Sequence, residues 1–117
     1  MSYTSVWVVA VTTANKEKYI AQVKEMAQAF KDNGALEVVD CWGAEVPEGK
    51  ITSFPLAVQK KEDETVALGY MHWPNKETHD KGMPAAMSDP RLSHDKFNNI
   101  FDGSRMIFAD FEVINKV

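Results

Sequence analysis

Apolar residues alternate with a period of two in several short segments of the chain. In residues 3–11 both alternating sets of positions are apolar. Residues two apart in a strand point to the same face of a sheet, so this segment predicts a strand covered on both sides. Residues 36–42, 65–73 and 105–113 predict three further strands, and residues 65–73 are again apolar on both faces.

A different period marks the segment between the first two predicted strands. Its apolar residues recur at steps of three and four, and most charged residues fall elsewhere on the helical wheel; the apolar set is Tyr19, Ile20, Val23, Met26, Ala27 and Phe30. This pattern predicts an amphipathic helix of about five turns. Thr13 or Asn15 can cap its start, and Gly34 can take the left-handed conformation that ends it.

Proline, glycine and charged residues predict where regular structure changes. Pro55 cannot donate a ladder hydrogen bond, so we expect residues 51–59 to be extended as an edge or bulged strand. The charged run 60–64 predicts a solvated hairpin loop. A second helix follows the third long strand, and we expect it to break near Gly82 and start afresh at Pro84, because an interior proline removes a helical hydrogen bond.

The order of the predicted elements is β-α-β-(β)-β-α-β. This order suits a ferredoxin-like βαββαβ arrangement, an α+β fold with helices on one face of an antiparallel sheet. Several strands are apolar on both faces, and the chain has no third long helix to cover the second face. We therefore expect one domain, residues 1–117, that pairs with a second copy of itself as a homodimer.

Composition and charge narrow the classes of function. The 117 residues are 44% hydrophobic and 26% charged, which is typical of a soluble globular domain with a substantial core. A formal net charge of −4 argues against nucleic-acid or anionic-membrane partners. The one cysteine, Cys41, cannot form an internal disulfide, and the apolar run 6–11 is too short to span a bilayer. We expect a cytoplasmic protein.

Motifs along nearly the whole chain resemble one family. In order, they are Gly34-Ala35-Leu36, Cys41-Trp42, residues 46–54, Ala57-Val58, residues 87–91 and residues 101–107. Together they resemble the YbaA-like family of small bacterial proteins of unknown function. The resemblance implies a dimeric α/β barrel, in a superfamily that includes cofactor-independent monooxygenases, muconolactone isomerase-like enzymes and haem-degrading proteins. It implies no particular activity for this chain, because a fold does not determine a function.

The sequence does not predict a metal or cofactor site. His72, His79 and His94 lack the i, i+4 spacing of a helical metal site, and no second cysteine is present. The chain contains neither a G-x-G-x-x-G nucleotide fingerprint nor a G-x-S-x-G nucleophile elbow. We therefore expect neither a metal nor a cofactor.

Three polar residues are candidates for a catalytic site at the ends of strands. His72 shares a strand face with Tyr70 and can act as an acid or base near neutral pH. Asp40 alternates with apolar neighbours along its strand, so its carboxylate needs a partner if it is buried. Arg105, at the start of the last strand, can be that partner. We expect the three to converge on one rim: His72 as proton acceptor, Asp40 as its orienting partner, and Arg105 stabilising negative charge. A purely structural Asp40–Arg105 ion pair is the alternative.

The predicted ligand pocket has aromatic walls, and the residues that we expect to form them are Tyr70, Trp42, Trp73 and Phe108. The first hypothesis is a protein that binds a small hydrophobic or aromatic molecule between sheet and helices. The second is a cofactor-independent monooxygenase or isomerase, and the third is a structural or interaction dimer without a ligand. A roomy apolar pocket favours the first, the same pocket with His72 and a carboxylate favours the second, and a fully packed interior favours the third.

Overall fold

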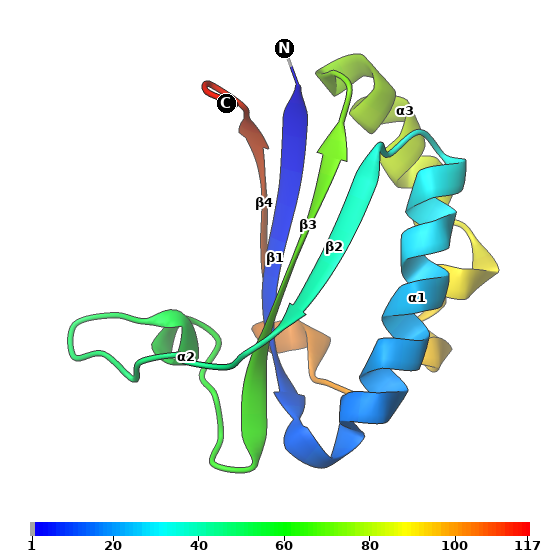
Figure 1. Cartoon of the computed structure of the whole chain (residues 1–117). Coiled ribbons are helices and arrows are strands. Elements are labelled where there is room, and N and C mark those ends of the chain that lie inside the picture. Colours follow the sequence, from blue (N-terminus) through cyan, green and yellow to red (C-terminus); the bar gives the residue numbers. More distant parts are fainter. Residues whose placement is uncertain (1) are drawn as a thin grey trace.

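The computed structural model describes residues 2–117. Four antiparallel strands form one sheet in the order β2-β3-β1-β4; the strands are β1 (Tyr3–Thr12), β2 (Glu37–Trp42), β3 (Glu64–Trp73) and β4 (Ile107–Glu112). Two helices, α1 (Lys16–Asp32) and α3 (Lys76–Met87), lie against one face of this sheet (Figure 1). This is the ferredoxin-like α+β fold that the element order predicts.

The strand register assigns side chains to the two faces of the sheet. Trp7 and Asp40 both pair with Gly69, so these positions share the face that α1 and α3 cover, which we call the covered face. His72 pairs with Thr4 and Glu37, and these positions point to the opposite face. We call it the open face, because only the segment between β2 and β3, with the short helix α2 (Phe54–Ala57), lies on that side (Figure 1).

The core lies on both sides of the sheet but is larger on the covered face. There Trp73 and Met71 are fully buried against Ala29 and Phe30 of α1. On the open face Val58, from the segment between β2 and β3, packs on one end of the sheet; its partners are Val8, Ala10 and Val66. The other end of the open face stays accessible.

Helix α3 is continuous from Lys76 to Met87, so the predicted break between Gly82 and Pro84 is wrong. Gly82 is a packing residue: a Cβ there would lie 2.2 Å from the Asn33 carbonyl oxygen and 2.6 Å from the Trp73 ring. Pro84 is exposed and removes a single backbone donor, and the bond from the Ser88 amide to the Pro84 carbonyl remains. The contacts of α3 with the core outweigh the local cost of the proline.

The segment 51–59 is also corrected, because it contains helix α2 instead of a strand. The Leu56 amide donates to the Ser53 hydroxyl at 3.1 Å, which caps this helix, and Pro55 lies in its first turn. Proline is tolerated there because the first amides of a helix have no partner within it.

At the ends of α1 the predictions hold in part. Gly34 has the expected positive φ of 109°, whereas the Asn15 side chain makes no capping bond and donates to the carbonyls of Asn99 and Ile100. Of the helices within residues 2–117, none has the length and apolar character needed to cross a membrane.

Candidate functional site

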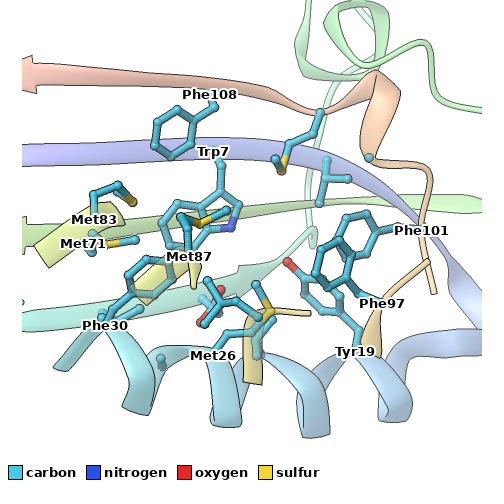
Figure 2. Close-up of a pocket in the computed structure, with 18 residues that line it drawn as sticks. Trp7, Tyr19, Met26, Phe30, Met71, Met83, Met87, Phe97, Phe101 and Phe108 are labelled. Carbon is cyan, nitrogen blue, oxygen red and sulfur yellow. The ribbon is translucent and has the colours of Figure 1, made fainter. Parts of the chain in front are cut away.

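A cavity of about 320 Å³ lies between the covered face of the sheet and the helices. Its walls come from all four strands, from α1 and α3, and from the segment between α3 and β4. Figure 2 shows these side chains converging on one space. The aromatic members are Trp7, Tyr19, Phe30, Phe97, Phe101 and Phe108, and the methionines are Met26, Met71, Met83, Met87 and Met106.

Local sequence spacing directs these side chains into the cavity. Met26 and Phe30 are four residues apart on α1, as are Met83 and Met87 on α3, so each pair shares a helix face. Phe97 and Phe101 stack with ring centroids 5.3 Å apart, and together they close one end of the cavity (Figure 2).

Trp7 forms the wall on the sheet side because β3 has a glycine beside it. A Cβ at Gly69 would lie 2.1 Å from two atoms of the Trp7 ring. The indole therefore lies flat against the sheet at this position, where any other residue would push it away. The missing side chain at Gly69 thus helps to shape the cavity.

Asp40 is the only carboxylate among the residues that line the cavity, and no lysine or arginine is among them. Its Oδ1 atom is buried and lacks a hydrogen-bond partner within the described part of the chain. Burial raises the pKa of Asp40 to about 6, because the charged form loses its hydration without gaining a compensating charge.

Tyr19 is the other titratable residue that lines the cavity, and it lies near Asp40. Burial is the main cause that raises the pKa of Tyr19, the negative charge of Asp40 adds to the rise, and a hydrogen bond with Trp7 opposes it. The phenol therefore stays neutral near pH 7. It supplies a hydroxyl beside an otherwise apolar wall.

A second hollow of about 290 Å³ runs along the outside between α1 and β2. Tyr19, Val23, Ala27, Val38 and Asp40 line both this groove and the cavity, so Asp40 lies at the boundary between the two spaces. Lys24, Cys41 and Trp42 border the groove alone.

The four aromatic residues that were predicted to line the pocket lie in different parts of the structure. Phe108 lines the cavity and Trp42 the adjoining groove. Trp73 is fully buried in the core, where its Nε1 donates to the Ser5 hydroxyl at 3.3 Å. Tyr70 lies on the open face beside His72, with ring centroids 5.2 Å apart.

The structure does not bring His72, Asp40 and Arg105 together, which corrects the predicted common rim. Asp40 pairs with Gly69 on the covered face, whereas His72 points to the open face, with Nδ1 2.9 Å from the Thr4 hydroxyl. His72 Nε2 is 3.8 Å from Glu37 Oε2. Strand alternation thus separates the two residues by the thickness of the sheet.

Arg105 belongs to a 3₁₀ turn, Gly103–Arg105, that precedes β4, and its partner is Glu64 instead of Asp40. Its two terminal nitrogens donate to Glu64 at 2.8 and 2.6 Å, and its Nε donates to Asp102 at 3.1 Å. The hydrogen bond from Arg105 lowers the pKa of Glu64. Glu64 is 7% exposed, so the charged run 60–64 is not solvated throughout.

Five of the six methionines line the cavity, although nothing in the sequence marks them as pocket residues. The i, i+4 spacing of Met83 and Met87 was the available signal, but the same spacing is typical of an ordinary core. Three or more His, Cys, Asp or Glu side chains do not gather as possible metal ligands anywhere in residues 2–117.

Comparisons of the sequence with known proteins find relatives of unknown function. A family model described as "Protein of unknown function (DUF1428)" matches residues 2–103. The uncharacterized protein YbaA of Escherichia coli is 40% identical over 114 residues, which cover 97% of each chain.

Solved structures with little sequence identity share the architecture. A dimeric ferredoxin-like protein from an uncultured marine organism has a TM-score of 0.63 at 9% identity, over 100% of both chains. SnoaB, a cofactor-independent oxygenase from Streptomyces nogalater, has a TM-score of 0.61 at 14% identity, over 99% of this chain and 96% of its own.

Proposed function

Since the chain belongs to the DUF1428 family of proteins of unknown function, we propose a function from its cavity: it binds a small hydrophobic or aromatic molecule between sheet and helices. The observation that carries this proposal is the open volume of about 320 Å³ behind apolar walls. Protein interiors leave few voids larger than a water molecule. Small-molecule sites typically have about 300–1,000 Å³ and a few polar groups among apolar ones.

The flexibility of the walls supports the same conclusion. Methionine has three rotatable bonds and a polarisable sulfur, and it packs favourably against aromatic rings. Met26, Met83 and Met87 line the cavity together with Phe30 and Phe108 (Figure 2). Such walls can adjust to planar ligands of somewhat different shape.

The test is a fluorescence titration with N-phenyl-1-naphthylamine, a neutral apolar probe. Ala27 lines the cavity on α1, and Ala27→Phe fills part of the space, so we expect the affinity to fall by about tenfold or more. Ala21→Phe, on the exposed side of the same helix, is the matched control and should keep the affinity of the unmodified protein. Failure of the unmodified protein to bind this probe would leave the dimer without a ligand as the better hypothesis.

The open face supports a second proposal, that two copies of the chain pair through it. Val6, Tyr70 and Val39 lie in one row across this face and are only half-buried. At its β4 edge, Ile107 and Phe111 are 44% and 54% exposed. One structural neighbour is named as a dimeric ferredoxin-like protein, which agrees with such pairing.

Light scattering coupled to size exclusion tests the dimer. We expect about twice the chain mass of 13.1 kDa for the unmodified protein and a shift to the single-chain mass for Phe111→Glu, which places a charge on the open face. Ile114→Glu is the control, because Ile114 is 91% exposed beyond the end of β4. A monomer at micromolar concentration would contradict the proposal.

An enzyme is the second candidate function, and the ionisable Asp40 at the cavity wall is the observation that favours it. A carboxylate with a pKa near 6 can accept a proton from an acidic C–H bond, as an isomerase requires. A cofactor-independent oxygenase, as SnoaB is named, would in addition need dioxygen and an electron-rich substrate.

Deuterium exchange at the acidic carbon of 2-tetralone in D₂O tests proton transfer directly. We expect the unmodified protein to accelerate the exchange and Asp40→Asn to remove the acceleration. Glu25→Gln, which removes an exposed carboxylate from α1, is the control. Equal exchange rates with the unmodified protein and Asp40→Asn would argue against Asp40 as the base.

A further inference from the structure

We propose that the cavity selects an organic cation, an amine with an apolar or aromatic body whose ammonium group pairs with the Asp40 carboxylate. This inference rests on the proposed binding function and names the class of ligand. It follows from the balance of charge around Asp40, from the aromatic rings near it, and from its place between cavity and groove.

The residues that line the cavity do not balance the charge of Asp40. The cavity lining contains one carboxylate and no lysine or arginine, and Asp40 Oδ1 has no hydrogen-bond partner among the described residues. Placing an ionised carboxylate in apolar surroundings is costly unless a counter-charge accompanies it. A bound cation supplies that counter-charge, whereas a neutral ligand supplies at most a hydrogen bond and an anion adds to the cost.

The two arginines of the chain, Arg91 and Arg105, are already paired with other acidic groups. Arg105 binds Glu64 and Asp102, with its closest approach at 2.6 Å. Arg91 binds Asp89 at 2.7 Å and Asp32 at 3.0 Å. Neither guanidinium can therefore pair with Asp40 without breaking its present ion pairs with other carboxylates.

Aromatic rings near Asp40 favour the same class of ligand. Trp7 and Tyr19 line the cavity with Asp40, and Trp42 lies two residues along β2 at the groove. Cations are attracted to the faces of such rings, most strongly to tryptophan. An ammonium already occupies one of them, since Lys16 Nζ is 5.6 Å from the centroid of the Trp42 ring.

The position of Asp40 also fits an amphipathic cation. Because Asp40 lines both spaces, an ammonium group can stay near the groove while its apolar body fills the cavity. The titratable groups around it are few: Tyr19 and Lys24 come from α1, and Cys41 comes from β2. The wall residues from β1 and β3, which include Trp7 and Met71, carry no titratable group.

Three naphthalene probes of matched size test the proposal at pH 7.5. They are 2-naphthylmethylamine, 2-naphthylmethanol and 2-naphthoate, and their affinities are measured by quenching of tryptophan fluorescence. We expect the amine to bind about tenfold or more tightly than the alcohol, because hydrogen bonds between charged groups are worth more than neutral ones. The anion should bind most weakly.

Asp40→Asn keeps the size of the side chain and removes its charge. In this variant we expect the amine to lose its advantage, while the alcohol keeps its affinity within about twofold. Glu25→Gln removes one negative charge from the exposed surface of α1 and should retain the preference for the amine, which controls for net charge.

The outcomes separate this inference from the proposed function on which it rests. If the alcohol and the amine bind the unmodified protein equally, or if the amine keeps its advantage in Asp40→Asn, the cavity binds apolar molecules but does not select a cation through Asp40. If none of the three probes binds, both the proposed function and this inference are wrong.

Discussion

Glu64 and Asp40 are acidic residues on neighbouring strands, and each has side-chain atoms removed from water. Glu64 is held by two hydrogen bonds from Arg105, and the Lys61 amide donates to it at 2.7 Å, so the pKa of this carboxyl is lowered. Asp40 has no such partners, and burial raises its pKa to about 6. A buried acid that only stabilises the fold is normally paired. The missing partner of Asp40 therefore points to a ligand.

The largest effect is expected where the paired carboxylate loses its partner. Arg105→Met leaves Glu64 buried and unpaired, which should lower the free energy of unfolding by about 3 kcal/mol in urea denaturation. The double variant Glu64→Gln with Arg105→Met should recover a large part of this loss. Arg91→Met is the control at a more exposed ion pair, and its loss should stay below about 1 kcal/mol.

A smaller loss of stability is expected at Gly69, where the Trp7 ring packs against the sheet. Gly69→Ala places a methyl group where the Trp7 ring now lies, so the indole must move and the fold should lose about 2 kcal/mol in thermal or urea unfolding. The affinity for apolar probes should fall as well. Gly103→Ala is the control, because Gly103 also lines the cavity but its added Cβ would meet no atom within 4 Å. Equal stability of the two variants would contradict the assigned role of Gly69.

The third prediction concerns the unpaired carboxylate itself. The pKa of Asp40 is higher in the folded chain, about 6, than the ordinary value of 3.8, so the folded state binds the proton more tightly. The contribution of Asp40 to stability is therefore most favourable below pH 3.8 and is lost as pH rises through 6. Asp40→Asn should raise the free energy of unfolding by about 2 kcal/mol at pH 8.

The pH dependence of stability distinguishes the removal of the Asp40 charge from a general gain in packing. At pH 4 the Asp40→Asn variant and the unmodified protein should differ little, since Asp40 is then protonated in the folded state and half-protonated in the unfolded chain. Urea denaturation at both pH values measures the difference. A stability gain that is the same at pH 4 and pH 8 would show that the charge of Asp40 is not its cause.

The sequence predicted the fold of this chain better than it predicted the surroundings of the two acids. Alternating apolar residues predicted the strands, and the element order predicted the ferredoxin-like fold. The site depended on register between strands that are far apart in the chain. Asp40 pairs with Gly69 and His72 with Glu37, and this offset places the two predicted partners on opposite faces. Because residues 65–73 are apolar on both faces, the pattern of that strand alone does not determine which face each of its residues takes.

Most of the side chains that line the cavity were equally hard to predict from the sequence. Met83 and Met87 have the spacing of core residues, and this spacing alone does not show that they line a cavity. The proline prediction failed for a related reason, because the contacts of Gly82 with Asn33 and Trp73 hold α3 in place. Local rules describe an isolated helix, whereas tertiary packing determines both its continuity and the space that it leaves.

The smallest effect is expected on the open face, at His72. His72→Ala removes a side chain whose contacts are Thr4, Glu37 and Tyr70, all on the side of the sheet away from Asp40. The affinity for N-phenyl-1-naphthylamine, measured by the same fluorescence titration, should therefore change by less than about twofold, because effects at sites without shared contacts are largely independent. A much weaker affinity would show that the cavity and the open face are coupled, and it would restore His72 as part of the binding site.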